Sequence, residues 1–375
     1  MGSASRPGSQ LTSVFVIPKK RLHRSQACAN ADMRVVLTNF GSSGSVVPNL
    51  ALAAELSRNG HSAVLALPPI FADSVESARL AFTPIGPDLR ELQKSINEEM
   101  TTASDCTMRF RCLLGPLTNS LPELYCSLMD AWRKADVLVG GQVQPAGLIV
   151  HEKTGILPVT VQNVYFTNGG SLAFQSTLAN LIKPFRETLG LHSLPDPIME
   201  ANQADLVFFA MSRHLRPHPS HWPRHYKLTG YFFMRESWKP EPELSSFFSG
   251  GPRPVVFTFG SMTYKYKDVM RALTLDVIRR VGCKAVIQDG WSDHTDQPFR
   301  CNVRAIGFAP HSWLFANTAT VVHHGGSARS AAVFRAGVPS VFVPHWDQPI
   351  VASLAQSLGF AGKSIPGSDL SSRPP

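Results

Sequence analysis

The spacing of hydrophobic and polar positions changes repeatedly along this chain, from short apolar runs to stretches with helical periodicity. Apolar runs at 35–39, 63–67 and 81–83 predict strands, and the stretches 46–59 and 71–80 between them have the 3.6-residue period of helices. A turn rich in glycine and serine joins the first strand to the first helix. Because a parallel neighbour needs a crossover connection, this alternation predicts a parallel sheet.

The same alternation continues to residue 210. Residues 89–134 are predicted to be helical with a break at Gly115 and Pro116. Further predicted elements are strands at 136–139, 158–161 and 206–210 and a helix at 145–153.

Prolines and glycines then become dense before a new strand pattern begins at 255–259. Such density is typical of a linker. We therefore predict an α/β protein with four parts, which are a disordered extension (1–32), a first domain (33–230), a linker (231–254) and a second domain (255–375).

The most informative pattern lies in the second domain. An apolar strand at 318–322 is followed by the turn His-His-Gly-Gly at 323–326, and residues 327–336 are alanine-rich and apolar at helical spacing. A helix that begins at a glycine turn presents its first backbone N–H groups and the positive end of its dipole. The sequence therefore predicts a phosphate or diphosphate site at 324–330.

Composition and charge exclude several function classes. The chain has 375 residues, of which 43% are hydrophobic and 17% charged, and this suits two globular domains. The formal charge of +9 suits a polyanionic ligand, but basic runs with interleaved aromatics are missing, so we expect no nucleic-acid partner. The six cysteines form no Cys-x-x-Cys pair. We expect a cytoplasmic protein with no metal site, no transmembrane segment and, at most, peripheral contact with a membrane.

Several motifs resemble those of family 1 glycosyltransferases with the GT-B fold, a group that includes bacterial rhamnosyltransferases, sterol glucosyltransferases and macrolide and glycopeptide glycosyltransferases. The matching motifs are Phe-Ala-Pro-His (308–311), His-His-Gly-Gly (323–326), Arg-Ala-Gly-Val-Pro (335–339) and Asp-Gln-Pro (347–349). The resemblance covers about residues 33–370. It implies two facing Rossmann-like domains with parallel sheets, the first binding an acceptor and the second a nucleotide-sugar.

Met33 stands where the first strand of the family begins, so we interpret residues 1–32 as a disordered extension. Residues 1–31 contain no acidic residue and several Ser and Arg, and a transit peptide is therefore the alternative interpretation.

The resemblance also implies a donor site, with UDP- or dTDP-sugar as co-substrate and no bound cofactor. Its candidate residues are Gly260, Ser261, Phe308, His311, His324, Gly325, Gly326, Ser327, Ala328, Arg329, Asp347 and Gln348.

Each candidate has a structural alternative. His324 matches a histidine that touches the diphosphate, and a buried turn histidine is its alternative role. Phe308 either stacks on the base or belongs to the core. Asp347 and Gln348 match a pair that binds the sugar hydroxyls, although Asp347 also suits a helix N-cap.

Two positions near the diphosphate depart from the resembled family. Ala328 and Arg329 stand where relatives usually place Gly or Asn and then Thr or Ser. A guanidinium at position 329 either adds a charge-assisted phosphate contact, fills the site or faces solvent. Diphosphate binding is therefore predicted in an altered form.

The acceptor side carries a further departure, because Ser45 stands where relatives place the Asp or His that deprotonates the acceptor. A serine hydroxyl does not have a suitable pKa for that role. Asp105 and His151 are conceivable substitutes. Ser42 and Ser43 are candidates for the acceptor pocket.

Aromatic side chains are further candidates for lining an apolar acceptor pocket, with core packing as the alternative. These are Trp132, Phe166, Phe174 and Phe185. His61 matches a structural position of the family and is not a site candidate.

The sequence thus predicts a metal-independent, inverting hexosyltransferase that acts on a hydrophobic hydroxylated small molecule such as a lipid, polyketide or sterol-like compound. The alternative is a catalytically impaired relative that binds nucleotide-sugar or activates a partner. Ser45 and Arg329 favour that alternative, as does the end of the chain at Pro375, since relatives usually continue into further helices.

Overall fold

The computed structural model of the chain describes residues 32–41, 43–90, 96, 99, 106–163, 172–215, 219–235, 238–260, 267–288, 301–344 and 349–365. The chain divides into two units, Met1–Asp32 and Met33–Pro375. Both sheets of the fold belong to the second unit.

The first sheet has seven parallel strands in the order β3-β2-β1-β4-β5-β6-β7. The strands are β1 (Arg34–Thr38), β2 (Ser62–Leu67), β3 (Ala81–Pro84), β4 (Val137–Gly141), β5 (Leu157–Gln162), β6 (Leu206–Phe209) and β7 (Tyr226–Leu228). The chain moves outward from β1 to β3 and then returns to the other side of β1 at β4. This reversal makes the sheet doubly wound, and crevices at the carboxyl ends of such strands are where ligands bind.

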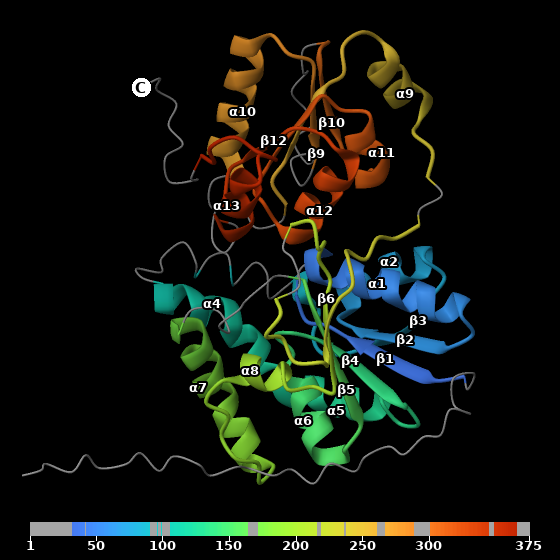
Figure 1. The fold of residues 1–375 in the computed structure, drawn as a ribbon, viewed down its shortest axis with the longest axis vertical. Helices are drawn as coiled ribbons and strands as arrows, with labels where there is room; N and C mark the ends of the chain where they lie inside the picture. Colours follow the sequence, from blue (N-terminus) through green and yellow to red (C-terminus); the bar gives the residue numbers. More distant parts are fainter. Residues whose placement is uncertain are drawn as a thin grey trace, which may run out of the picture. The chain divides into compact units, whose positions relative to one another are not determined.

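Helices cover both faces of this sheet (Figure 1). They are α1 (Ser43–Arg58), α2 (Ala72–Ser77), α4 (Cys106–Asn119), α5 (Leu121–Ala131), α6 (Pro145–Thr154), α7 (Leu172–Thr188) and α8 (Pro197–Ala201), with a short 3-10 helix, η2 (Pro69–Phe71).

Alternate residues of the central strand face the two cores, as the period of two along a strand requires. Val35 and Leu37 pack with α1 and α2. Val36 packs with α5, α6 and α7.

The second sheet has five parallel strands in the order β10-β9-β8-β11-β12. The strands are β8 (Val255–Thr258), β9 (Ala285–Gln288), β10 (Val303–Ile306), β11 (Thr320–His323) and β12 (Ser340–Phe342), and the helices are α9 (Pro242–Ser249), α10 (Lys267–Val281), α11 (His311–Ala316), α12 (Ser327–Ala336) and α13 (Pro349–Ser357). One face of the sheet packs against α10, and the other packs against α9, α11 and α12. The predicted α/β class with two parallel, doubly wound sheets is confirmed.

Two local predictions are corrected. Helix α1 begins at Ser43 rather than after the predicted turn, so Ser45 lies in its first turn. Helix α4 runs through Gly115 and Pro116, where we expected a break. Tertiary packing overrides the local signal, because Leu114 and Leu117 of α4 are buried in the core that α7 also contributes to.

A further helix, α9, lies inside the segment that we predicted to be a linker. None of the helices in the described residues is long and apolar enough to cross a membrane.

Candidate active site

The second sheet presents the predicted phosphate site at the carboxyl end of β11. His323 is fully buried there, and its ring centroid lies 4.5 Å from that of Phe342. Its Nδ1 accepts a hydrogen bond of 3.3 Å from the Gly325 N–H. Burial, followed by the positive charges of His324, Arg329 and His311, lowers the pKa of His323 to about 3. His323 is therefore a neutral residue that is buried in the second domain.

Gly260 lies beside His324 and Arg329, although it comes more than sixty residues earlier in the chain. A β-carbon on Gly260 would lie 2.6 Å from Nη1 of Arg329 and 3.1 Å from Cε1 of His324. A β-carbon on Gly326 would lie 2.5 Å from Nε2 of His324. Gly260 also has a φ of 74°, which glycine adopts without strain. Only glycine fits at 260 and 326 without displacing these two side chains.

The same place is the N-terminus of α12. Gly326 is the N-cap, and the first helical hydrogen bond runs from the Ser330 N–H to the Gly326 carbonyl at 2.9 Å. The N–H groups of residues 327–329 therefore precede the helical ladder. Together with the helix dipole, Arg329 and His324, they make this turn a favourable environment for an anion.

Phe308 follows β10 and is 78% exposed, which excludes the core interpretation of this residue. Its ring faces solvent and is accessible to a planar ligand. His311, three residues later, opens α11, and its ring stacks on Phe315 with 4.7 Å between the centroids.

The first sheet brings Ser45 close to the same turn. The side-chain Nδ2 of Asn39 donates to the Ser45 carbonyl at 2.9 Å, and that of Asn163 donates to the same carbonyl at 3.4 Å. The backbone carbonyl of Asn163 in turn accepts a hydrogen bond from the hydroxyl of Ser327. Helix α1 also contacts α12. Neither Asn39 nor Asn163 was a site candidate from the sequence, although each directly follows a strand of the first sheet.

The structure argues against His151 as a substitute for the base at position 45. His151 lies in the last turn of α6, where its Nδ1 is 2.7 Å from the Ile156 carbonyl. A helix that leads into a parallel strand ends at the amino edge of the sheet, whereas Ser45 follows the carboxyl end of β1. His61 lies at that amino edge too, since the Met33 N–H donates to its Nδ1 at 3.4 Å.

Several predicted positions lie outside the described residues and stay predictions. These are Ser42, Asp105, Phe166, Ser261, Asp347 and Gln348, together with the side chain of Ser43.

The predicted aromatic lining of an acceptor pocket is packed into the first domain instead. Trp132, Phe174 and Phe185 pack against the core cluster beneath α5, α6 and α7. Phe185 makes an edge contact with Tyr125 at 5.7 Å between ring centroids. The core interpretation therefore holds for these three residues.

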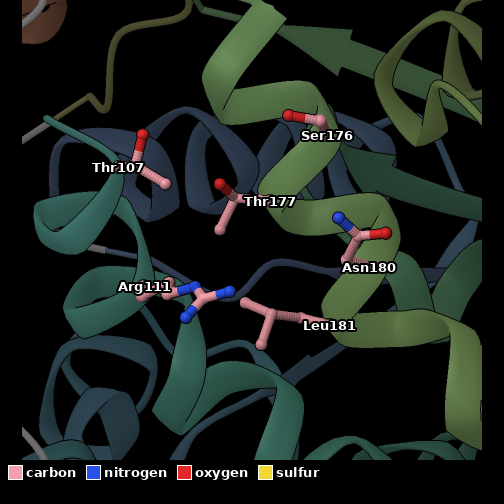
Figure 2. Close-up of a pocket in the computed structure, with 6 residues that line it drawn as sticks. All are labelled: Thr107, Arg111, Ser176, Thr177, Asn180 and Leu181. Carbon is pink, nitrogen blue, oxygen red and sulfur yellow. The ribbon is translucent and has the colours of Figure 1, made fainter.

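A pocket of about 230 Å³ lies between α4 and α7 (Figure 2). Five of its six lining residues have polar side chains, including one guanidinium from α4, and the sixth is a leucine from α7. The lining residues are Thr107, Arg111, Ser176, Thr177, Asn180 and Leu181.

Two family models match the chain, one in the domain of the first sheet and one in the domain of the second sheet. The glycosyltransferase family 28 N-terminal domain matches residues 35–167, and the C-terminal domain of erythromycin biosynthesis protein CIII-like proteins matches residues 272–373. Together they cover more than half of the chain.

Curated relatives point the same way. The sterol 3-beta-glucosyltransferase of Leptosphaeria maculans is 26% identical over 87% of this chain and 25% of its own length. The uncharacterized glycosyltransferase Mb1551 of Mycobacterium bovis is 28% identical over 87% of this chain and 85% of its own. The chain thus spans about a quarter of the length of the sterol glucosyltransferases that it matches.

Solved structures share the fold at low sequence identity. The kitacinnamycin glycotransferase has a TM-score of 0.68 at 18% identity and covers 91% of this chain and 88% of its own. The Streptomyces sp. SF2575 glycosyltransferase SsfS6 with thymidine diphosphate has a TM-score of 0.61 at 19% identity over 88% and 87%. The spinosyn rhamnosyltransferase SpnG with spinosyn aglycone gives the same TM-score and identity over 88% and 85%.

Two doubly wound parallel sheets, the second with a glycine turn at the N-terminus of α12, have the architecture of the GT-B fold. One family model matches the first domain and the other matches the second, in the order of the chain. The chain belongs to the family 1 glycosyltransferases of the GT-B fold.

Proposed function

We propose that this protein transfers a hexose from a UDP- or dTDP-sugar to a hydroxyl of a hydrophobic small molecule, with inversion at the anomeric carbon and without a metal ion or bound cofactor. The observation that carries the proposal is the convergence of Gly260, His324 and Arg329 on the N-terminus of α12. These groups suit a diphosphate leaving group. The names of the relatives support sterols or natural products as the acceptor class.

In this proposal the donor diphosphate lies on the α12 turn. The acceptor oxygen forms a bond to the anomeric carbon while the bond from that carbon to the β-phosphate oxygen breaks, and the electron pair leaves with the diphosphate. His324, Arg329 and the N–H groups of α12 stabilise the developing negative charge because they are fixed in place before the reaction. The hydroxyl proton ends on the released diphosphate.

The second domain also offers a ring for the base of the nucleotide. Phe308 is exposed at the carboxyl end of β10, and a planar uracil or thymine would cover it. Asp347 and Gln348 are proposed to bind the hydroxyls of the sugar. We place the reaction in the cytoplasm, with a hydrophobic acceptor taken from solution or from a membrane surface.

The alternative is a relative that binds nucleotide-sugar without efficient turnover. Ser45 favours it, because a serine at this position cannot take a proton from the acceptor at neutral pH. A binding-only protein of this kind would act by activating a partner.

Titration calorimetry with UDP and dTDP tests the proposal directly. We expect association with at least one of them, weakened at least tenfold in His324→Ala, because a charge-assisted contact to phosphate is lost. His214→Ala, at an exposed histidine of the first domain, is the matched control and should bind like the unmodified protein. Absence of binding by both nucleotides to folded protein would refute the proposed donor site.

Turnover distinguishes the two functions. Hydrolysis of UDP-glucose and dTDP-glucose and transfer to a panel of sterols would be measured for the unmodified protein and for Ser45→Asp. Transfer by the unmodified protein supports the enzyme. Nucleotide binding without turnover, with activity gained by Ser45→Asp, supports the impaired relative.

A further inference from the structure

Asn163 links the two sides of the proposed reaction centre. It directly follows β5 in the first sheet, and its backbone carbonyl accepts a hydrogen bond from the hydroxyl of Ser327 in the first turn of α12. Its side-chain Nδ2 donates to the carbonyl of Ser45, 3.4 Å away. One residue thus touches both the position of the family base and the proposed diphosphate site.

The contact with Ser45 settles which way the carboxamide of Asn163 is turned. A backbone carbonyl can only accept, so the NH2 group must face Ser45. The side-chain Oδ1 then points away from that carbonyl. It is buried and has no hydrogen-bond partner among the described residues. Buried acceptors of this kind are uncommon in folded proteins and suggest that a donor arrives with a ligand.

An unpartnered buried oxygen is not sufficient by itself, because Gln144 and Gln162 also have one. Their amide groups bond within the first sheet's own polar network, Gln144 to Thr38 and Gln162 to Asn202. Asn163 differs because its other contacts are the first turns of α1 and α12. Its free oxygen therefore lies where acceptor and donor must meet if the proposed function holds.

We propose that Oδ1 of Asn163 accepts the hydrogen bond of the attacking hydroxyl and directs the oxygen lone pair of that hydroxyl toward the anomeric carbon. This inference rests on the proposed function. It assigns to Asn163 the orientation of the attacking hydroxyl, a role for which Ser45 is not suited. An amide cannot take up the proton, so Asn163 orients the nucleophile without acting as a base. The ligand class is any neutral hydroxyl, including water in the hydrolysis of the donor.

Three variants at one position test the assignment. Asn163→Leu has nearly the same size and removes the acceptor oxygen. We expect both donor hydrolysis and transfer to fall about 10- to 100-fold, the effect of a lost hydrogen bond in a buried site, with unchanged affinity for UDP or dTDP. Asn163→Asp keeps the shape and supplies a carboxylate. It should be active, with a rate that rises with pH as the carboxylate ionises, a limb that the unmodified protein lacks.

Two further single variants, Asn163→Ser and Ser327→Ala, distinguish a role of Asn163 in orienting the substrate from a role in stabilising the fold. Ser327→Ala removes the tie to the backbone of Asn163 and leaves Oδ1 in place, so its turnover should stay above that of Asn163→Leu at equal melting temperature. Asn163→Ser should lose turnover like Asn163→Leu.

Two results would overturn the inference. One is turnover by Asn163→Leu or Asn163→Ser equal to that of the unmodified protein. The other is a loss of turnover that matches a loss of nucleotide affinity or of melting temperature, because this would make Asn163 a structural residue. If the unmodified protein itself bound neither UDP nor dTDP, the proposed function would fail first, and the inference with it.

Discussion

His323 makes the second domain sensitive to acid in a way that the structure defines. The histidine is buried and neutral, with its Nδ1 accepting from the Gly325 N–H and its pKa lowered to about 3. In the unfolded chain the same side chain has a pKa of about 6.5. The unfolded state therefore binds a proton between these two values and the folded state does not, so stability falls as the pH falls from about 6.5 towards 3.

The magnitude follows from the two pKa values. Each pKa unit between the folded and unfolded values corresponds to about 1.4 kcal/mol. Acidification to below both pKa values would therefore lower the free energy of unfolding by about 5 kcal/mol. Only part of this appears at moderate pH. At pH 5 the expected loss from this one group is about 2 kcal/mol relative to pH 7.5.

Urea unfolding at pH 7.5 and 5.0, followed by fluorescence, measures this loss. His323→Asn keeps an acceptor near the Gly325 N–H and cannot be protonated. We expect the variant to be less stable than the unmodified protein at pH 7.5, because it loses the ring contact with Phe342, but to lose about 2 kcal/mol less on going to pH 5. The same substitution at the exposed His214 is the control and should leave the pH dependence unchanged. An identical pH dependence in His323→Asn and the unmodified protein would show that this reasoning is wrong.

The remaining predictions concern one glycine and one ion pair. Gly260→Ala should lower the free energy of unfolding by about 1–3 kcal/mol and weaken UDP or dTDP binding, because a β-carbon there has both an unfavourable φ of 74° and the Arg329 side chain 2.6 Å away. Gly337 has a similar φ of 65° with open space around it, so Gly337→Ala is the control. It should lower the melting temperature because of backbone strain but bind nucleotide normally. Equal losses of nucleotide binding in the two variants would contradict the role given to position 260. Arg186, 1% exposed, bonds Glu152 at 2.6 and 2.8 Å, and Arg186→Met should cost about 3–5 kcal/mol in urea unfolding, most of it recovered in the double variant with Glu152→Met. No recovery in the double variant would mean that lost packing, and not an unpaired carboxylate, causes the effect.

Local patterns were sufficient to predict most strands and the glycine turn that precedes α12. The inner strands β1, β2, β4, β5 and β6 are mostly apolar, as expected for a parallel sheet buried on both faces, and the short edge strand β3 was predicted from its place in the alternation. Strand β7 was not predicted, because its three residues lie at the sheet edge and none of them is fully buried. The turn before α12 was predicted because strand, glycine pair and helix are consecutive in the sequence.

The connection through Asn163 could not be predicted from local pattern. The connection joins positions 45, 163 and 327, and each is more than a hundred residues from the next along the chain. Only the packing of α1 against α12 brings them together. The same is true of the contact between Gly260 and Arg329. An asparagine after an apolar strand is a common residue, and nothing in its neighbours along the chain distinguishes it from a loop asparagine.

The order of strands in the first sheet has a consequence for how the protein is made on the ribosome. Strand β1 lies at the centre of the sheet, and its second partner, β4, begins only at Val137. The hydrogen-bonding edge of β1 that pairs with β4 therefore stays without its partner while about a hundred further residues are translated. Nascent chains of this protein should consequently depend on chaperones until β4 has emerged, and heterologous expression should benefit from slow synthesis at low temperature.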